Sequence, residues 1–221
     1  MRLLDYMARE GFRATIKKAA NKISAKLGGK SSETVFLCRM VQGFMAVSVP
    51  TEYQIRELSE SDIDEFAEFN FFPHIEVSDY VSAEKDGALG CFEKGELIGY
   101  VCYESEKIKT IHGTGDFILS KSEAWIGPCY VDRVHRGKGL NKALVQAVAA
   151  SLAQKGIITL FTSINGANTS SLASFKKMGF QEFALYSDRC GVRPVANMPN
   201  DVVSGSVLKE KILISKTKKG N

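Results

Sequence analysis

The chain has 221 residues, of which 44% are hydrophobic and 24% charged, and its formal net charge is +4. These values are typical of a soluble globular domain, and no apolar run approaches the roughly 20 residues that a membrane-spanning helix needs. The charge is uneven, because residues 1–30 carry a net +6 and the remaining residues sum to −2.

Charge and cysteine usage exclude several classes of protein. The basic excess belongs to the N-terminal segment and not to the body, so we expect no nucleic-acid partner. No secretory signal is expected, because residues 1–30 lack a continuous apolar stretch and a small-residue cleavage site. The five cysteines form no CxxC pair, and with three histidines they show no metal-ligand spacing, so we expect no metal. The dispersed cysteines fit a reducing compartment, and we expect a cytoplasmic protein.

The N-terminal segment is predicted to be helical. Apolar residues recur at helical spacing from Leu4 to Leu27, and Gly28–Gly29 would end that helix. Residues 34–41 and 44–49 are predicted to pair as a β-hairpin. We assign residues 1–50 to a basic extension and 51–221 to the main domain. The helix is expected to dock on that domain. The alternative is a peripheral contact of residues 1–30 with an anionic membrane. A homodimer is a further open alternative.

The main domain alternates strands and helices. Residues 53–58 are predicted as a strand and 59–69 as a helix, on which Asp62, Asp64 and Glu65 are interpreted as a solvated face. Residues 87–105 suggest two strands joined at Lys94–Gly95. Residues 122–132 suggest a strand interrupted at Gly127–Pro128, because proline cannot donate to a ladder. A helix over 140–154, a buried strand over 157–163, a helix over 168–179 and strands at 182–187 and 207–215 follow, with 187–206 irregular. The fold class is α/β with mixed order (α+β).

A glycine-rich basic turn lies between the interrupted strand and the 140–154 helix. Gly137 and Gly139 would let an anion approach the bare backbone at the positive end of the helix dipole. Arg136, Lys138 and Lys142 add positive charge. The spacing fits neither a P-loop nor a dinucleotide fingerprint, since Lys142 stands where the latter needs a third glycine.

Two motifs resemble those of the GCN5-related N-acetyltransferase (GNAT) family over about residues 52–186. "YVDRVHRGKGL" is similar to its strand, R-G-x-G turn and helix, and "NTSSLASFKKMGF" is similar to its Asn-led helix. The resemblance implies a mostly antiparallel twisted sheet with a bulged, splayed central strand and helices on both faces. It also implies that the anion is the pyrophosphate of acetyl-CoA, bound by Val131, Arg136, Gly137, Lys138, Gly139, Leu140, Lys142, Asn168, Ser171 and Lys177.

The resemblance implies acetyl transfer from acetyl-CoA to a primary amine of a small molecule or protein. Many family members place a tyrosine acid where this chain has Phe175. Glu123 is the candidate base; the other interpretation is that Glu123 is simply an exposed residue at the start of a strand. Tyr130, Tyr186 and Ser171 are candidate acids. A catalytically silent acyl-CoA-binding module is the alternative. His135 is interpreted as a solvated turn residue, and Trp125 as part of the core.

Overall fold

The computed structural model describes residues 33–42, 44, 49–70, 72, 76–81, 86–108, 117–187 and 191–194. They form a mixed α/β fold in which strand pairing is mostly antiparallel, as expected. The chain divides into two compact units. The first holds the described parts of Ala46–Tyr103 and Pro128–Val148, and the second those of Ser32–Met45, Glu104–Gly127 and Ala149–Asn221.

The first unit carries the strands β2 (Tyr53–Glu57), β3 (Gly87–Glu93) and β4 (Glu96–Ser105), in the order β4-β3-β2. The C-terminal half of β7 (Glu123–Val131) lies next to β4. The turn at Lys94 and Gly95, with φ of 53° and 90°, joins β3 to β4 as a two-residue hairpin loop. The expected strand at 53–58 and the expected hairpin at 87–105 are therefore confirmed.

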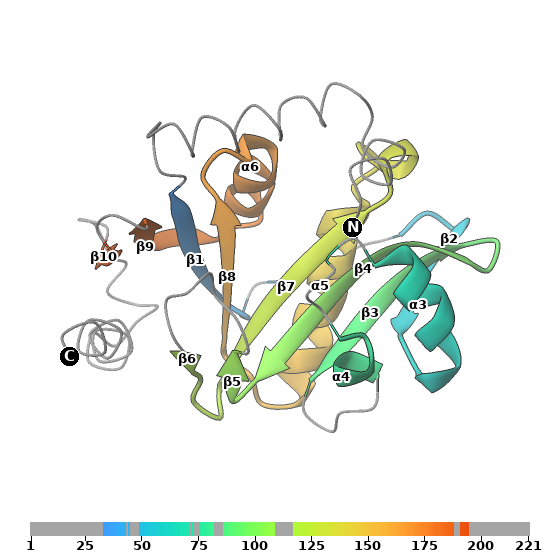
Figure 1. Cartoon of the computed structure of the whole chain (residues 1–221), viewed down its shortest axis with the longest axis horizontal. Helices are drawn as coiled ribbons and strands as arrows, with labels where there is room; N and C mark the ends of the chain where they lie inside the picture. The colour runs from blue at the N-terminus through green and yellow to red at the C-terminus, as the bar shows by residue number, and fades with distance from the viewer. Residues whose placement is uncertain are drawn as a thin grey trace. The chain divides into compact units, whose positions relative to one another are not determined.

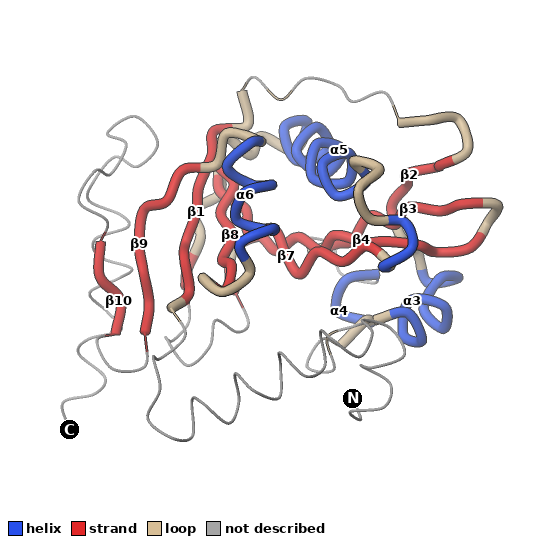
Figure 2. The backbone as a smooth tube through the Cα atoms, turned by 90° about the horizontal axis from the view of Figure 1, so that it is seen from above, coloured by secondary structure: helices blue, strands red, loops and turns tan. Residues whose placement is uncertain are grey.

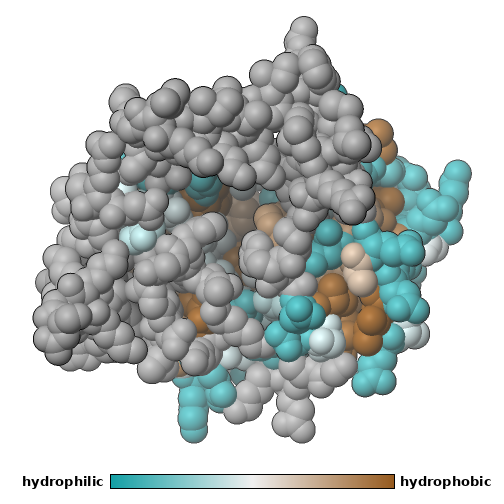
Figure 3. Space-filling model, in the orientation of Figure 1, coloured by the Kyte–Doolittle hydropathy of each residue, from teal (hydrophilic) through white to brown (hydrophobic). Residues whose placement is uncertain are grey.

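Helices cover both faces of these strands in Figure 2, where α3 (Ile63–Phe69) and α4 (Ser78–Val81) lie opposite α5 (Leu140–Gln154). A core of aromatic and aliphatic side chains, including Phe66, Tyr80 and Tyr100, joins α3 and α4 to the strands. Figure 3 shows a small hydrophobic group among hydrophilic residues in the part of the view where α3 and α4 lie. None of the described helices is long and apolar enough to cross a bilayer.

The second unit orders its strands as β10-β9-β1-β8-β7 (Figure 1). These are β10 (Gly191–Pro194), β9 (Gln181–Ser187), β1 (Thr34–Met40), β8 (Thr159–Asn165) and the first half of β7. The small strands β5 (Lys107–Ile108) and β6 (Phe117–Ile118) pair separately, and α6 (Thr169–Lys177) connects β8 to β9. Its core includes Phe36, Trp125 and Phe183, so the prediction for Trp125 is confirmed.

β1 corrects the predicted hairpin. Strand character at residues 34–41 is confirmed, but β1 pairs with β8 on one edge and with β9 on the other. With both edges occupied, β1 has no free edge for residues 44–49, most of which lie outside the described residues. β1 is buried between two strands, and residues 34–40 form part of the second unit.

The structure confirms some of the remaining predictions and changes others. The helix predicted over 140–154 is present as α5, and the one predicted over 168–179 is present as the shorter α6. The strand predicted at 157–163 lies two residues later, as β8. Part of the segment expected to be irregular, 187–206, forms β10, which pairs with β9. The helix predicted over residues 2–27 and the strand over 207–215 lie outside the described residues.

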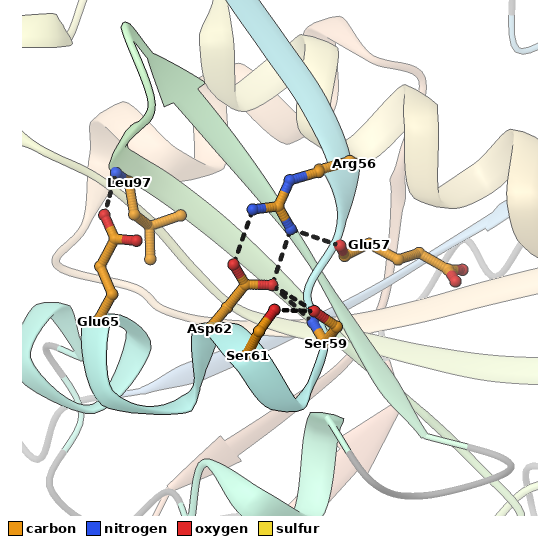
Figure 4. A network of polar contacts seen from close by, with 7 residues as sticks. All are labelled: Arg56, Glu57, Ser59, Ser61, Asp62, Glu65 and Leu97. Carbon is orange, nitrogen blue, oxygen red and sulfur yellow. Dashed lines mark hydrogen bonds and ion pairs between the residues drawn. The ribbon is translucent and has the colours of Figure 1, made fainter.

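The start of α3 is anchored by an ion pair, which corrects the interpretation of Asp62 as part of a solvated face. Arg56 on β2 contacts both carboxylate oxygens of Asp62, each at 2.7 Å, and Asp62 is only 6% exposed (Figure 4). Asp62 also accepts hydrogen bonds from the N–H and hydroxyl of Ser59 at 2.8 Å. Asp64 and Glu65 are exposed, as expected, although Glu65 also accepts the Leu97 N–H at 2.6 Å. Arg56 is only six residues before Asp62 but belongs to a strand and not to the helix, so helical periodicity could not reveal this pairing.

We predict that this ion pair stabilises the fold above about pH 4. The hydrogen bond from Arg56 lowers the pKa of Asp62 far below its unfolded value of about 3.9, against the effect of burial. A depressed folded pKa adds stability that is present above the unfolded pKa and lost as the pH falls towards the folded one. Asp62→Asn should destabilise the protein by about 1–2 kcal/mol at pH 7. This is less than for a fully buried ion pair, because Arg56 is partly exposed and solvent screens its charge.

Urea unfolding at pH 7 and at pH 3 measures this effect. The difference between wild type and Asp62→Asn should shrink at the lower pH, because the wild-type carboxylate loses part of its contribution there. Asp64→Asn, at an exposed position two residues along, is the matched control and should change stability by less than about 0.5 kcal/mol. Equal effects of the two substitutions at pH 7 would contradict the prediction.

Candidate functional site

In the first unit, the glycine turn joins the end of β7 to α5. The Asp132 N–H donates to the Ile98 carbonyl at 2.9 Å and so ties the end of β7 to β4. A short 3-10 helix, η2 (Arg133–His135), follows, capped by the Asp132 carboxylate on the Arg133 N–H at 2.7 Å. The chain therefore enters the turn from an anchored position.

The backbone of the turn is open. Gly137 and Gly139 have φ of 84° and 81°, in the left-handed region, and a Cβ at either position would meet no atom within 4 Å. The Ala143 N–H donates to the Gly139 carbonyl at 3.0 Å, in the helical pattern. The N–H groups at the start of α5 have no acceptor inside the helix. Such N–H groups, at the positive end of a 15-residue helix, are donors of the kind that bind anions.

The basic side chains of the turn lie against the protein. Arg136 donates from Nε to the Val131 carbonyl at 2.9 Å, and its guanidinium lies 5.5 Å from the centre of the Tyr130 ring. Lys138 donates to the Tyr53 hydroxyl at 2.9 Å. That hydrogen bond, with the charges of Glu93 and Glu52, raises the pKa of Lys138, which therefore stays charged at neutral pH.

Two further predicted residues of the turn differ in exposure. Lys142 is exposed on the first turn of α5, where its charge can reach an anion. Leu140 is buried, so only its backbone N–H could serve the site. The turn thus offers backbone donors at its centre and cationic side chains at its edges.

His135 corrects its interpretation as a solvated turn residue. Its side chain is only 14% exposed and lies between two carboxylates. Nε2 is 3.3 Å from Glu93, at the end of β3, and Nδ1 is 3.4 Å from Asp132. Glu93 lies 42 residues earlier in the chain and reaches the turn only through strand pairing, so no local motif could have identified it.

Tyr130, a candidate acid, lies in an aromatic cluster. It is buried in β7, with its ring centre 5.5 Å from that of Phe69 and 6.1 Å from that of Tyr100. The Tyr100 hydroxyl donates to Asn70 at 2.8 Å, which fixes the residue after α3. In the first unit, the structure thus brings Tyr130, Val131 and the 136–142 turn together.

In the second unit, Glu123 is the first residue of β7. Its carboxylate accepts the Ser120 N–H at 2.7 Å, and its own N–H donates to the Ser120 carbonyl at 3.1 Å. Pairing of β7 with β8 covers only Glu123 to Trp125. Gly127, with φ of 130°, follows, so the irregularity predicted at Gly127–Pro128 falls where this pairing ends. Glu123 therefore has a local structural role beside any chemical one.

The Asn-led helix holds the remaining predicted residues. Asn168 caps α6 by accepting the Ser171 N–H at 3.2 Å, so these two residues lie together. Lys177 is exposed in the last turn. Phe175 is buried against Phe180, with ring centres 5.0 Å apart, and Tyr186 is buried in the core of this unit. No hydrogen bond or ion pair between described residues links Glu123 to Ser171.

Comparisons with known proteins identify the family. The profile of the acetyltransferase (GNAT) family matches residues 53–180, more than half of the chain. A protein of Methanocaldococcus jannaschii, named as an uncharacterised N-acetyltransferase, is 23% identical over 147 residues, which cover 59% of this chain and 61% of that protein.

Two solved structures share the fold. A Drosophila protein has a TM-score of 0.53 at 17% identity, over 82% of this chain and 58% of its own. AAC(6')-Iy, solved with the bisubstrate analogue CoA-S-monomethyl-acetylneamine, has a TM-score of 0.50 at 15% identity, over 67% of this chain and 99% of its own. The chain thus spans about three fifths of the M. jannaschii and Drosophila proteins. The family profile covers β2 to the end of the Asn-led helix, including the open turn, and the chain belongs to the acetyltransferase (GNAT) family.

Proposed function

We propose that the chain is an acetyl-CoA-dependent N-acetyltransferase that acts on a primary amine of a small molecule or protein. The observation that carries this proposal is the open turn at Gly137 and Gly139, at the start of α5. Its backbone donors suit a pyrophosphate, because a Cβ there would occupy the space that the phosphates need. Membership of the family supports the same ligand, as does the CoA analogue bound to AAC(6')-Iy.

In the first unit, the turn would bind this ligand with the N–H groups of Gly137 to Leu140 and the charges of Arg136, Lys138 and Lys142. In the second unit, Asn168, Ser171 and Lys177 on α6 are proposed as cofactor-binding residues from family membership alone. The backbone of Val131 and its neighbours would pair with the amides of the pantetheine arm, as a strand pairs with a sheet edge. One lone pair of the Val131 carbonyl accepts Arg136, which leaves the other for this pairing.

When bound, acetyl-CoA supplies an activated thioester. The attacking amine must be neutral and the departing thiolate must gain a proton, so the protein needs a base and an acid. We propose Glu123 as the base, directly or through water. Tyr130 and Ser171 are the proposed acids, because Phe175 has no proton to donate and is packed against Phe180.

A catalytically silent acyl-CoA-binding module is the second candidate. The buried Phe175 and the engagement of Glu123 with the Ser120 N–H favour it. Steady-state turnover over a panel of amines separates the two functions, because a silent module would bind acetyl-CoA without releasing CoA. The panel should hold an aminoglycoside, a polyamine, an amino sugar and peptides with free N-termini; the first is suggested by the acetylneamine analogue in AAC(6')-Iy.

We predict that Gly137→Asp weakens binding of acetyl-CoA about tenfold or more, because it puts a carboxylate where the pyrophosphate is proposed to lie. Calorimetry with acetyl-CoA measures the effect. Gly156→Asp is the matched control, since Gly156 also has a positive φ, of 83°, and open space around a Cβ, but lies beyond the other end of α5. Unchanged affinity of Gly137→Asp would refute the proposed site.

We predict that Glu123→Gln lowers kcat/KM about a hundredfold while affinity for acetyl-CoA stays the same. Glutamine keeps an oxygen that can accept the Ser120 N–H, so the local structure from Ser120 to Glu123 should survive while the basic group is lost. Turnover of the best amine of the panel, followed across pH, measures the change. A rate and pH profile equal to those of wild type would mean that Glu123 has only its structural role with Ser120.

A further inference from the structure

Glu93 is the hub of a polar network beside the turn. It stands directly opposite Tyr53, the first residue of β2, in the strand ladder, and the Tyr53 hydroxyl helps to lower the pKa of the Glu93 carboxylate. His135 contacts the same carboxylate at 3.3 Å, and Lys138 donates to Tyr53 at 2.9 Å. The Glu93 carboxylate thereby contacts His135, two residues before Gly137. Through Tyr53 it also reaches Lys138, the residue after Gly137.

The charges of the network agree with this arrangement. Although desolvation alone would raise it, the pKa of Glu93 lies below its ordinary range because of His135, Tyr53 and Lys138. The carboxylate is therefore ionised at neutral pH and attracts Lys138. On the other side of His135, Asp132 lies 3.4 Å from Nδ1 and caps η2. The chain on both sides of Gly137 is thus fastened to the β2–β3 edge and to the end of β7.

We propose that Glu93 is a positioning residue for acetyl-CoA, which holds the turn in its open, pyrophosphate-binding form through Tyr53, Lys138 and His135. This inference rests on the proposed function. A glycine-rich turn loses much conformational freedom when it closes around a ligand, so fastening it beforehand strengthens binding. The network also turns Lys138 aside, so that the backbone between Gly137 and Gly139 faces open space.

Simple electrostatics predicts the opposite effect, which makes the proposal testable. A carboxylate close to Lys138 opposes an anion in the turn, so removing its charge should by itself tighten binding of acetyl-CoA. If Glu93 acts by positioning, its removal must weaken binding instead. The sign of the change therefore distinguishes the two effects.

The test is calorimetry of acetyl-CoA with wild type, Glu93→Gln and Glu96→Gln. Glu96 faces Glu93 across the hairpin and is exposed, so its variant makes the same charge change without touching the network. We expect Glu93→Gln to raise Kd about fivefold and Glu96→Gln to leave it within about twofold. Tyr53→Phe, which keeps the ring and loses the hydroxyl, should raise Kd about threefold and serves if Glu93→Gln does not fold.

A double-mutant cycle separates positioning from general loss of stability. In a Lys138→Met background, Glu93→Gln should lose part of its effect on Kd, because one of its two connections to the turn is already gone. Additive effects, tighter binding, or equal behaviour of Glu93→Gln and Glu96→Gln would each overturn the proposal. A wild-type protein that does not bind acetyl-CoA would instead refute the proposed function.

Discussion

The N–H groups in the first turn of α5 have no acceptor inside the helix, and the surroundings of the turn keep them open. A basic side chain lying over them would fill the space that an anionic ligand needs. Arg136 and Lys138 are instead drawn aside, by the Val131 carbonyl and by the Tyr53 hydroxyl. The site therefore depends as much on the acceptors that hold these cations as on the cations themselves.

The β2–β3 edge supplies one of those acceptors, the Tyr53 hydroxyl, and is itself fastened by charge. Arg56 on β2 pairs with Asp62, and Glu65 on α3 accepts the Leu97 N–H at the start of β4. Tyr53 and Glu93, at the far ends of β2 and β3, contact the turn. Strand pairing places all of these side chains, because Tyr53 and Glu93 stand directly opposite each other in the ladder.

In the second unit, a strand from before the family profile completes the sheet. The profile begins at residue 53, yet β1 lies between β8 and β9, which the chain connects through α6. The backbone carbonyl of Glu33, just before β1, accepts the N–H of Gly166 at 2.7 Å. Gly166 lies in the loop that leads to Asn168. We therefore propose that the folded domain begins before residue 34, and not at 51 as composition had suggested.

The sequence by itself determined the local elements and the open glycine turn before α5. Helical periodicity, the Lys94–Gly95 turn and the paired glycines before α5 are short-range signals, and the structure has each where it was predicted. The same holds for α6, because its asparagine cap lies next to the helix it begins. Each of these features depends on residues only a few positions apart.

Tertiary structure alone decided which side chains meet across strands. His135 looks solvated in the sequence because its neighbours are polar, but Glu93 comes from 42 residues away and covers it. β1 looks like half of a hairpin because residues 44–49 also resemble a strand, but its edges are taken by β8 and β9. Asp62 looks exposed until Arg56, six residues earlier on β2, folds back against it. Periodicity reports how one element is patterned, whereas the pairings of His135 and of β1 depend on strand order and register, which involve residues far apart in the chain.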